Sequence, residues 1–283
     1  MINKAINHRG WLKSLLFIPL LVFSQIFGVL VLLILGYDLM EISSNVMNES
    51  VMIVIEYSGL FIVIIMIWLF MKFIDKQPLI EIGFQTQGRL KEINYGILFG
   101  LFIMAFAFVF LSTIGEIVFL SYSLDFNQIL LSIALFIGVS FFEEIIFRGY
   151  MLKNLLESFN PTVALLISSL FFSLIHASNL NVTLLGLCNI FLAGIFLGVS
   201  YVFTKNLWFP IALHFSWNFF QAMFGFKVSG LDSYSIIEFM IPYNNMINGG
   251  EFGFESSILS IIVLFIGTII IWNYFKKYGI KKH

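Results

Sequence analysis

The chain has 283 residues, of which 60% are hydrophobic and only 11% charged, and its formal net charge is −1. Soluble domains typically contain about 45–50% apolar and about 25% charged residues. This composition therefore excludes a cytosolic globular protein, a disordered chain and a nucleic-acid-binding protein. The single cysteine, Cys188, excludes an internal disulfide bond. A mean hydropathy of +0.99 indicates a multi-span membrane protein.

Hydrophobic runs long enough to cross about 30 Å of hydrocarbon occur along the whole chain. Eight such runs lie near Trp11–Leu35, Val51–Phe73, Tyr95–Ile114, Ile129–Tyr150, Thr162–Ala177, Thr183–Phe203, Trp208–Phe226 and Ile258–Phe275. The first is too long for a signal-peptide core and no small-residue cleavage site follows it, so we expect a retained span. The sequence predicts an all-α fold, a polytopic transmembrane helical bundle of about eight spans, with residues 1–283 forming a single domain.

The lysine and arginine residues predict the orientation of the bundle. If the N-terminus is cytoplasmic, eight spans return the C-terminus to the cytoplasm, and only Lys227 among the 15 basic residues is external. The positive-inside rule predicts this bias. The internal residues are Lys4, Arg9, Lys13, Lys72, Lys76, Arg89, Lys91, Arg148, Lys153, Lys205, Lys276, Lys277, Lys281 and Lys282. We expect a cytoplasmic connector at Gln77–Asn94, with a short amphipathic piece on the membrane surface, and a long external segment at Lys227–Ser257.

Charged and polar side chains inside the spans are few. Each charge costs about 2.5–3.5 kcal/mol in hydrocarbon and marks a functional site by default. Alone, Glu56 is more typical of a helix-packing or snorkelling group, and Glu116 of a solvated side chain near the outer interface. Two acids, two histidines and an asparagine in three spans together favour a catalytic or ion-binding site. These residues are Glu143, Glu144, His176, His214 and Asn218.

The local spacing of these residues predicts how they pair. Glu144 and Arg148 are four residues apart, so they share a helix face and can form an ion pair. Glu143 points about 100° away from Glu144, which leaves its carboxylate for water or a metal. His214 and Asn218 also share one face.

The helix rise allows the polar residues of the three spans to meet. At about 1.5 Å per residue, Glu143 and His176 both lie roughly 20 Å from the inner ends of their helices. His214 and Asn218 lie roughly 10–15 Å into theirs. We therefore expect the four side chains to converge if the inner end of the fourth span protrudes slightly.

Three motifs resemble those of a known family. Residues 142–150, Phe-Glu-Glu-Ile-Ile-Phe-Arg-Gly-Tyr, contain E-E-x-x-x-R. Phe172 to His176 forms F-x-x-x-H, and His214 to Asn218 forms H-x-x-x-N after an apolar lead-in. The set, in this order, resembles the CAAX-protease and bacteriocin-processing (CPBP, or Abi) family of intramembrane proteases. The resemblance covers about residues 125–225, which we interpret as a protease-like core.

The resemblance implies a membrane endopeptidase, of a family usually labelled metalloprotease, whose buried site opens to the cytoplasmic side. Glu143 would activate a water with His176 beside it, His214 and Asn218 would stabilise the oxyanion, and Glu144, Arg148 and Phe172 would support them. Such chemistry needs an activated water and an oxyanion donor. Glu143, His176 and His214 would also suit a divalent metal, with Zn²⁺ as the expected ion. We expect a peptide or membrane-anchored protein substrate and a location in the bacterial cell membrane, with both termini cytoplasmic.

Two other functions are compatible with the residues. A non-catalytic bacteriocin-immunity-type membrane protein would keep the family resemblance without hydrolysis. An ion-coupled transporter would also place Glu and His inside the bundle, but it predicts repeated or broken helices in two halves, which the sequence does not show. The sequence names no substrate: a prenylated C-terminus, a leader peptide or another membrane protein would each fit.

Overall fold

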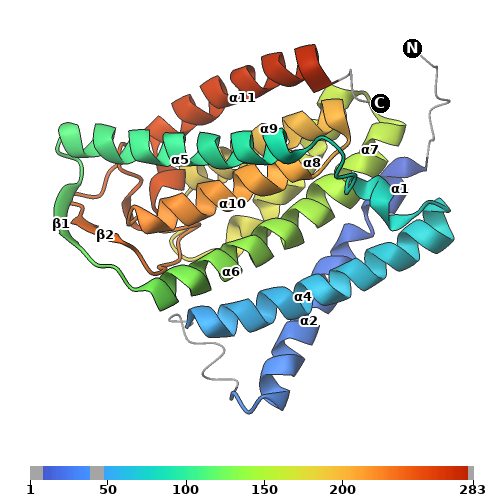
Figure 1. Ribbon diagram of the computed structural model, residues 1–283, viewed down its shortest axis with the longest axis horizontal. Helices are drawn as coiled ribbons and strands as arrows, with labels where there is room; N and C mark the ends of the chain where they lie inside the picture. Colours follow the sequence, from blue (N-terminus) through green and yellow to red (C-terminus); the bar gives the residue numbers. More distant parts are fainter. Residues whose placement is uncertain (1–8, 39–47, 280–283) are drawn as a thin grey trace.

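The computed structural model describes residues 9–38 and 48–279, so Lys4, His8, Lys281, Lys282 and His283 lie outside the described residues. Long helices run roughly along one axis of the molecule, and short helices and two strands join them at its two ends (Figure 1). The main helices are α1 (Gly10–Ser14), α2 (Phe17–Ile34), α4 (Glu49–Phe70), α5 (Leu90–Thr113), α6 (Phe126–Glu144), α7 (Lys153–Ser158), α8 (Pro161–Ile175), α9 (Leu184–Thr204), α10 (Trp208–Met223) and α11 (Ile258–Tyr278).

Seven helices of the described residues are long and apolar enough to cross a membrane, which confirms the predicted polytopic helical bundle. The remaining predicted span, Trp208–Phe226, is the seventh along the chain and forms α10, which has only 16 residues. At 1.5 Å per residue it is about 24 Å long, shorter than the hydrocarbon core of about 30 Å. Most of its side chains are buried, because α10 packs inside the bundle against α5, α6 and α9. A helix enclosed by other helices does not have to match the thickness of the lipid.

Polar side chains at the helix starts explain several of the boundaries. Asp125 accepts hydrogen bonds from the backbone of Asn127 and Gln128 at the start of α6. Asn160 caps α8, whose first residue is Pro161, and both residue types are favoured at these positions. Between the two caps the chain is one continuous helix, α6, the π-helix η3 (Ile145–Leu152) and α7, as the sequence predicts.

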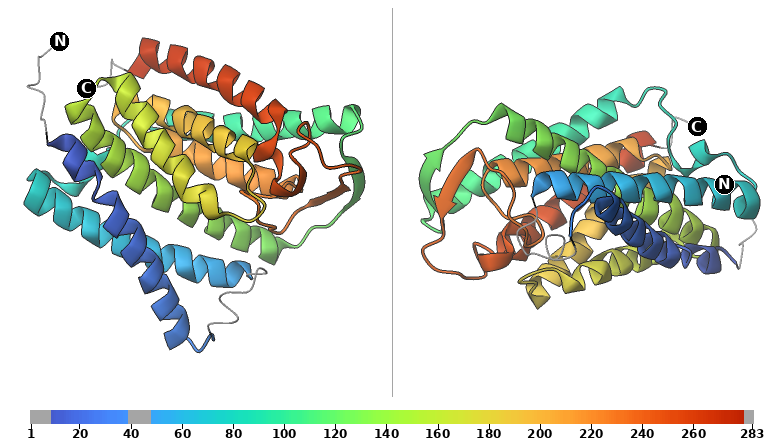
Figure 2. Two further views of the ribbon diagram at one scale, coloured as in Figure 1. Left: turned by 180° about the vertical axis from the view of Figure 1, so that it is seen from behind. Right: turned by 90° about the horizontal axis from the view of Figure 1, so that it is seen from below.

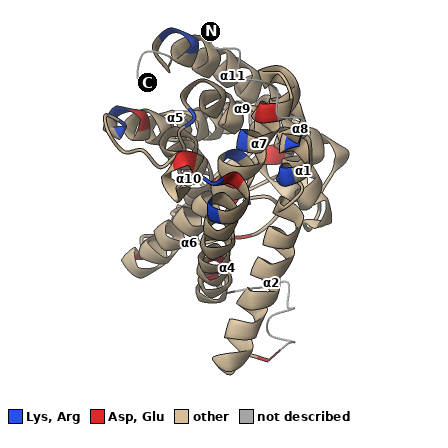
Figure 3. Ribbon diagram, turned by 90° about the vertical axis from the view of Figure 1, so that its right-hand side faces the viewer, with Lys and Arg blue, Asp and Glu red and all other residues tan. Residues whose placement is uncertain are grey.

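Basic side chains gather at the end of the molecule where α1 and the last turn of α11 lie (Figure 3). The connector 77–94 lies at this end but is more tightly held than a surface segment. In its 3₁₀ helix η2 (Leu79–Ile82), the Ile82 carbonyl accepts a hydrogen bond from the Tyr201 hydroxyl. The Leu207 N–H donates to the Gly83 carbonyl. These contacts join the connector to the start of α10.

The opposite end of the molecule carries structure that the sequence did not predict. Strand β1 (Val118–Tyr122) pairs antiparallel with β2 (Ile237–Met240), and both lie beyond the ends of the helices (Figure 2). Glu116 accepts hydrogen bonds from Asn245 and Asn248 at 2.7 and 2.8 Å. It is therefore not simply solvated, as predicted, but holds the segment between α10 and α11, which also contains the 3₁₀ helices η5 (Gly250–Phe252) and η6 (Phe254–Ser256).

The close approach of α5 to α10 sets the position of α10. A Cβ atom on Gly100 would lie 2.8 Å from Ser216 Cβ, and one on Gly96 would lie 2.9 Å from Leu213 N. The Ser216 hydroxyl donates to the Gly96 carbonyl at 2.9 Å. Small residues four apart allow two helices to pack at backbone distance. This face of α5 therefore fixes α10, which carries His214 and Asn218.

Candidate active site

The two adjacent acids lie where α6 ends and η3 begins. π-Helical turns are rare and are frequently found at functional sites. Glu144 is fully buried in the bundle, whereas Glu143 lines a cavity. The structure thus separates the two carboxylates, as the helix geometry predicts.

The Glu144 carboxylate is the centre of a buried polar cluster. Its Oε1 accepts hydrogen bonds from Arg148 Nη1 at 2.7 Å and from His214 Nδ1 at 2.8 Å. Arg148 also donates to the Gly194 carbonyl at 3.1 Å, and its guanidinium lies 4.5 Å from the centre of the Phe172 ring. The predicted Glu144–Arg148 pair is therefore present. Through Glu144 it holds the His214 ring by its Nδ1 atom, on the side away from Glu143.

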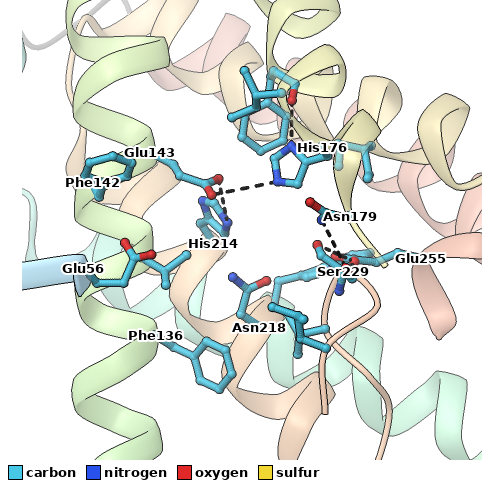
Figure 4. A pocket seen from close by; sticks show the side chains of 18 of the residues that line it. Glu56, Phe136, Phe142, Glu143, His176, Asn179, His214, Asn218, Ser229 and Glu255 are labelled. Carbon is cyan, nitrogen blue, oxygen red and sulfur yellow. Dashed lines mark hydrogen bonds and ion pairs between the residues drawn. The ribbon is translucent and has the colours of Figure 1, made fainter. Parts of the chain in front are cut away.

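The two histidines have the same arrangement around Glu143 (Figure 4). His176 Nδ1 lies 2.7 Å from the Phe172 carbonyl, which can only accept, so Nδ1 donates. His214 Nδ1 donates to Glu144. In each ring the Nε2 atom therefore faces Glu143. His176 Nε2 lies 3.9 Å from Glu143 Oε1, and His214 Nε2 lies 3.8 Å from Glu143 Oε2. These separations are too long for direct hydrogen bonds and suit a bridging water.

A cavity of about 560 Å³ joins these side chains to the rest of the candidate set. Phe172 and Asn218 line it together with Glu143, His176 and His214, whereas Glu144 and Arg148 are not among its lining residues. The structure thus brings together all the site residues that the sequence predicted. Glu144 stands behind the cavity, so we assign it to positioning rather than to contact with a substrate.

The cavity extends toward the end of the molecule that carries β1 and β2. Its lining includes Ser229 and Glu255, both from the segment between α10 and α11. Glu255 accepts hydrogen bonds from Ser229 N and Oγ at 2.7 and 2.9 Å and from Trp217 Nε1 at 3.2 Å. If both termini are cytoplasmic, as predicted, this is the external end of the molecule. The predicted orientation and the cytoplasmic opening implied by the resemblance therefore lead to different ends, and both stay predictions.

The hydrogen bonds of the two histidines are typical of metal ligands, but the positions of the three predicted ligands do not form a metal site. Histidine ligands usually donate their second ring N–H to a carboxylate or a backbone carbonyl, as His176 and His214 do. However, no group of three or more His, Cys, Asp or Glu side chains in the described part of the chain is placed to hold a metal ion. The Zn²⁺ site at Glu143, His176 and His214 stays a prediction.

A comparison with protein families decides which family the central helices resemble. Residues 125–220 match the family described as "Type II CAAX prenyl endopeptidase Rce1-like". This segment is Rce1-like. The match confirms the predicted resemblance and runs from the cap of α6 into α10, so it contains every predicted site residue. Together with the seven apolar helices, it supports an integral membrane protein whose central segment resembles a peptidase family. Searches of the curated proteins and of the solved structures found no match.

The cavity also has walls outside the Rce1-like segment. Leu21 and Gln25 come from α2, Glu56 comes from α4, and Ser229 and Glu255 follow α10. Glu56 was visible in the sequence as a charge inside a span, but a lone acid is more typical of helix packing. Glu255 gave no signal, because it lies outside the apolar runs and reaches the site only through the fold of the external segment.

Proposed function

We propose that the protein is an intramembrane endopeptidase of the CAAX-processing type that hydrolyses a peptide bond with a water activated by Glu143. The observation that carries the proposal is the arrangement of Glu143 between two imidazole Nε2 atoms, at 3.8 and 3.9 Å, in a cavity within the Rce1-like segment. A water in this gap would contact the carboxylate and a histidine at once, which is the geometry that general-base catalysis needs.

In the proposed reaction, Glu143 removes a proton from the water while the water oxygen attacks the carbonyl carbon of the substrate. His176 Nε2 accepts the second hydrogen bond of that water. The Asn218 carboxamide, which lines the cavity beside the histidines, donates to the oxyanion, and the His214 ring stabilises the developing charge with it. Glu143 then passes its proton to the leaving nitrogen as the C–N bond breaks. Such oxyanion donors contribute about 10²–10³ in rate each.

Glu144 and Arg148 act on this reaction through His214. The bond from His214 Nδ1 to Glu144 fixes the plane of the ring, and the pair with Arg148 holds the Glu144 carboxylate in place. We therefore assign both residues to positioning.

The test is cleavage of a reporter panel by the purified protein in detergent or in vesicles. The panel contains a prenylated C-terminal peptide, a leader-type peptide and a membrane-anchored segment. We expect at least one reporter to be cleaved, and Glu143→Gln to abolish that cleavage. Glu116→Gln is the matched control, because Glu116 contacts only the external segment, and we expect it to retain normal turnover. Normal turnover by Glu143→Gln would refute the proposal and favour an immunity-type or transport role.

The same assay tests the predicted metal. A chelator should abolish cleavage, and Zn²⁺ should restore it, only if Glu143, His176 and His214 are ligands. Full activity after chelation, with the metal content of the protein verified as negligible, would refute the Zn²⁺ prediction and leave the Glu143 mechanism standing.

A further inference from the structure

The second carboxyl group in the cavity, that of Glu56, has no place in the reaction described above. Glu56 comes from α4, far outside the Rce1-like segment, yet its side chain points into the space shared by Glu143, His214 and Asn218 (Figure 4). It forms no hydrogen bond or ion pair with any part of the chain that the structure describes. An acid in a membrane span normally has a partner. We therefore expect the partner of Glu56 to be a ligand that enters the cavity.

The charge of the cavity wall indicates what that partner is. Among the described lining residues there are three carboxyl groups and no lysine or arginine. Glu255 is occupied by Ser229 and Trp217, and the basic groups beside Glu143 are the Nε2 atoms of His176 and His214, at 3.9 and 3.8 Å. Glu56 has no ion-pair partner in the described chain, because Arg148 is tied to Glu144 and Gly194 behind the wall. A carboxyl group without a partner in a cavity favours a ligand of the opposite charge.

We propose that Glu56 is a specificity-determining residue that binds a lysine or arginine side chain of the substrate close to the scissile bond. This inference rests on the proposed endopeptidase function. A buried ion pair compensates for desolvation only when both partners are present and well placed, so a cationic side chain gains most from this carboxyl group. An extended peptide advances about 3.3–3.6 Å per residue. Because Glu56 and Glu143 share one cavity, the basic residue lies within about three residues of the cleaved bond.

The experiment uses peptides based on a cleaved reporter, changed at one position at a time over three residues on each side of the bond. Each position carries lysine, norleucine or glutamate; norleucine keeps the apolar stem and lacks the ammonium group. We expect one position at which kcat/KM for lysine exceeds that for norleucine about tenfold or more, and at which glutamate is the poorest. Glu56→Gln should reduce the ratio of kcat/KM for the lysine peptide to kcat/KM for the norleucine peptide from about tenfold to about one. Glu116→Gln should keep the preference.

A binding arm makes the result decisive. If wild-type protein cleaves none of the peptides, binding of the lysine and norleucine series is measured by fluorescence anisotropy, with Glu56→Gln beside wild type, and the same lysine preference is expected.

The failure of this inference differs from the failure of the proposed function. Glu143-dependent cleavage with no lysine preference at any position would overturn the role of Glu56 and keep the endopeptidase. Equal loss of cleavage for all peptides in Glu56→Gln would also overturn it, because a specificity residue acts on one substrate class. Cleavage that does not depend on Glu143 would refute the proposed function instead.

Discussion

Arg148 shows how a single side chain can be both a buried charge and a support for the site. It is 1% exposed, and it contacts the Glu144 carboxylate, the Gly194 carbonyl and the face of Phe172 at once. The guanidinium geometry allows these contacts together, which the point charge of a lysine does not.

Replacing Arg148 by alanine should therefore harm both folding and activity. The change leaves the fully buried Glu144 carboxylate without its cation, which costs about 3–5 kcal/mol. We expect a lower unfolding temperature in detergent and a lower expressed yield. The double variant Arg148→Met/Glu144→Gln removes both charges and should recover much of the stability, but not the activity. A well-folded and fully active Arg148→Ala protein would show that Arg148 is only an anchor at the membrane surface.

Glu143 and His176 should act as one unit around the same water. Residues that act as a unit are strongly non-additive in kinetics. Glu143→Ala alone should remove nearly all hydrolysis, and adding His176→Ala should reduce the remaining rate little further, while Asn218→Ala alone should cost about 10²–10³ in kcat. Single-turnover rates of the three variants and the double variant check this. Multiplicative effects of Glu143→Ala and His176→Ala would contradict a shared water.

At the scale of elements, the contact between α5 and α10 connects packing to the site. α10 carries both His214 and Asn218, and its position depends on the glycine face of α5, where Ser216 bonds to Gly96. A shift of α10 along or away from α5 would therefore move the oxyanion donors relative to Glu143 on α6.

A large side chain on this face should disturb the site from a distance. Gly100→Leu places atoms where Ser216 lies, and overpacking of this kind costs about 1–3 kcal/mol. We expect a lower unfolding temperature and a reduced kcat. Val109→Leu on the exposed face of the same helix is the control and should change neither. Wild-type activity in a stably folded Gly100→Leu protein would show that the α5–α10 distance does not govern the site.

At the scale of the whole molecule, the distribution of charge separates two ends. Basic side chains gather where α1 and the end of α11 lie (Figure 3), and the cavity extends toward the other end. The positive-inside rule predicts that the basic end is cytoplasmic, and with that orientation the cavity extends toward the external half of the bilayer.

Reporter fusions test this orientation. A reporter fused behind the last residue should behave as cytoplasmic. A reporter inserted after Tyr243, which is 83% exposed in the external segment, should behave as external. The expected readouts are activity of a cytoplasm-dependent reporter at the first site and its loss at the second. The reverse pattern would place the cavity mouth in the cytoplasm and would refute the predicted topology.

The sequence by itself determined what depends on local spacing and on composition. Apolar run lengths predicted the bundle, and the four-residue spacing predicted the Glu144–Arg148 pair. Three motifs in order predicted the family of the central segment, which the family match confirms. These features follow from helix periodicity, from the cost of polar groups in lipid and from residue identity, all of which can be read without knowing which helices touch.

Only the tertiary structure decided the features that depend on which helices touch. The bond between His214 and Glu144 joins residues 70 positions apart, the sheet of β1 and β2 joins two external segments, and α10 is short because neighbouring helices enclose it. Glu56 entered the cavity because α4 packs against α6. The side of a helix that faces a cavity is set by its neighbours, and an apolar span with nearly uniform hydropathy does not encode that choice in its own sequence.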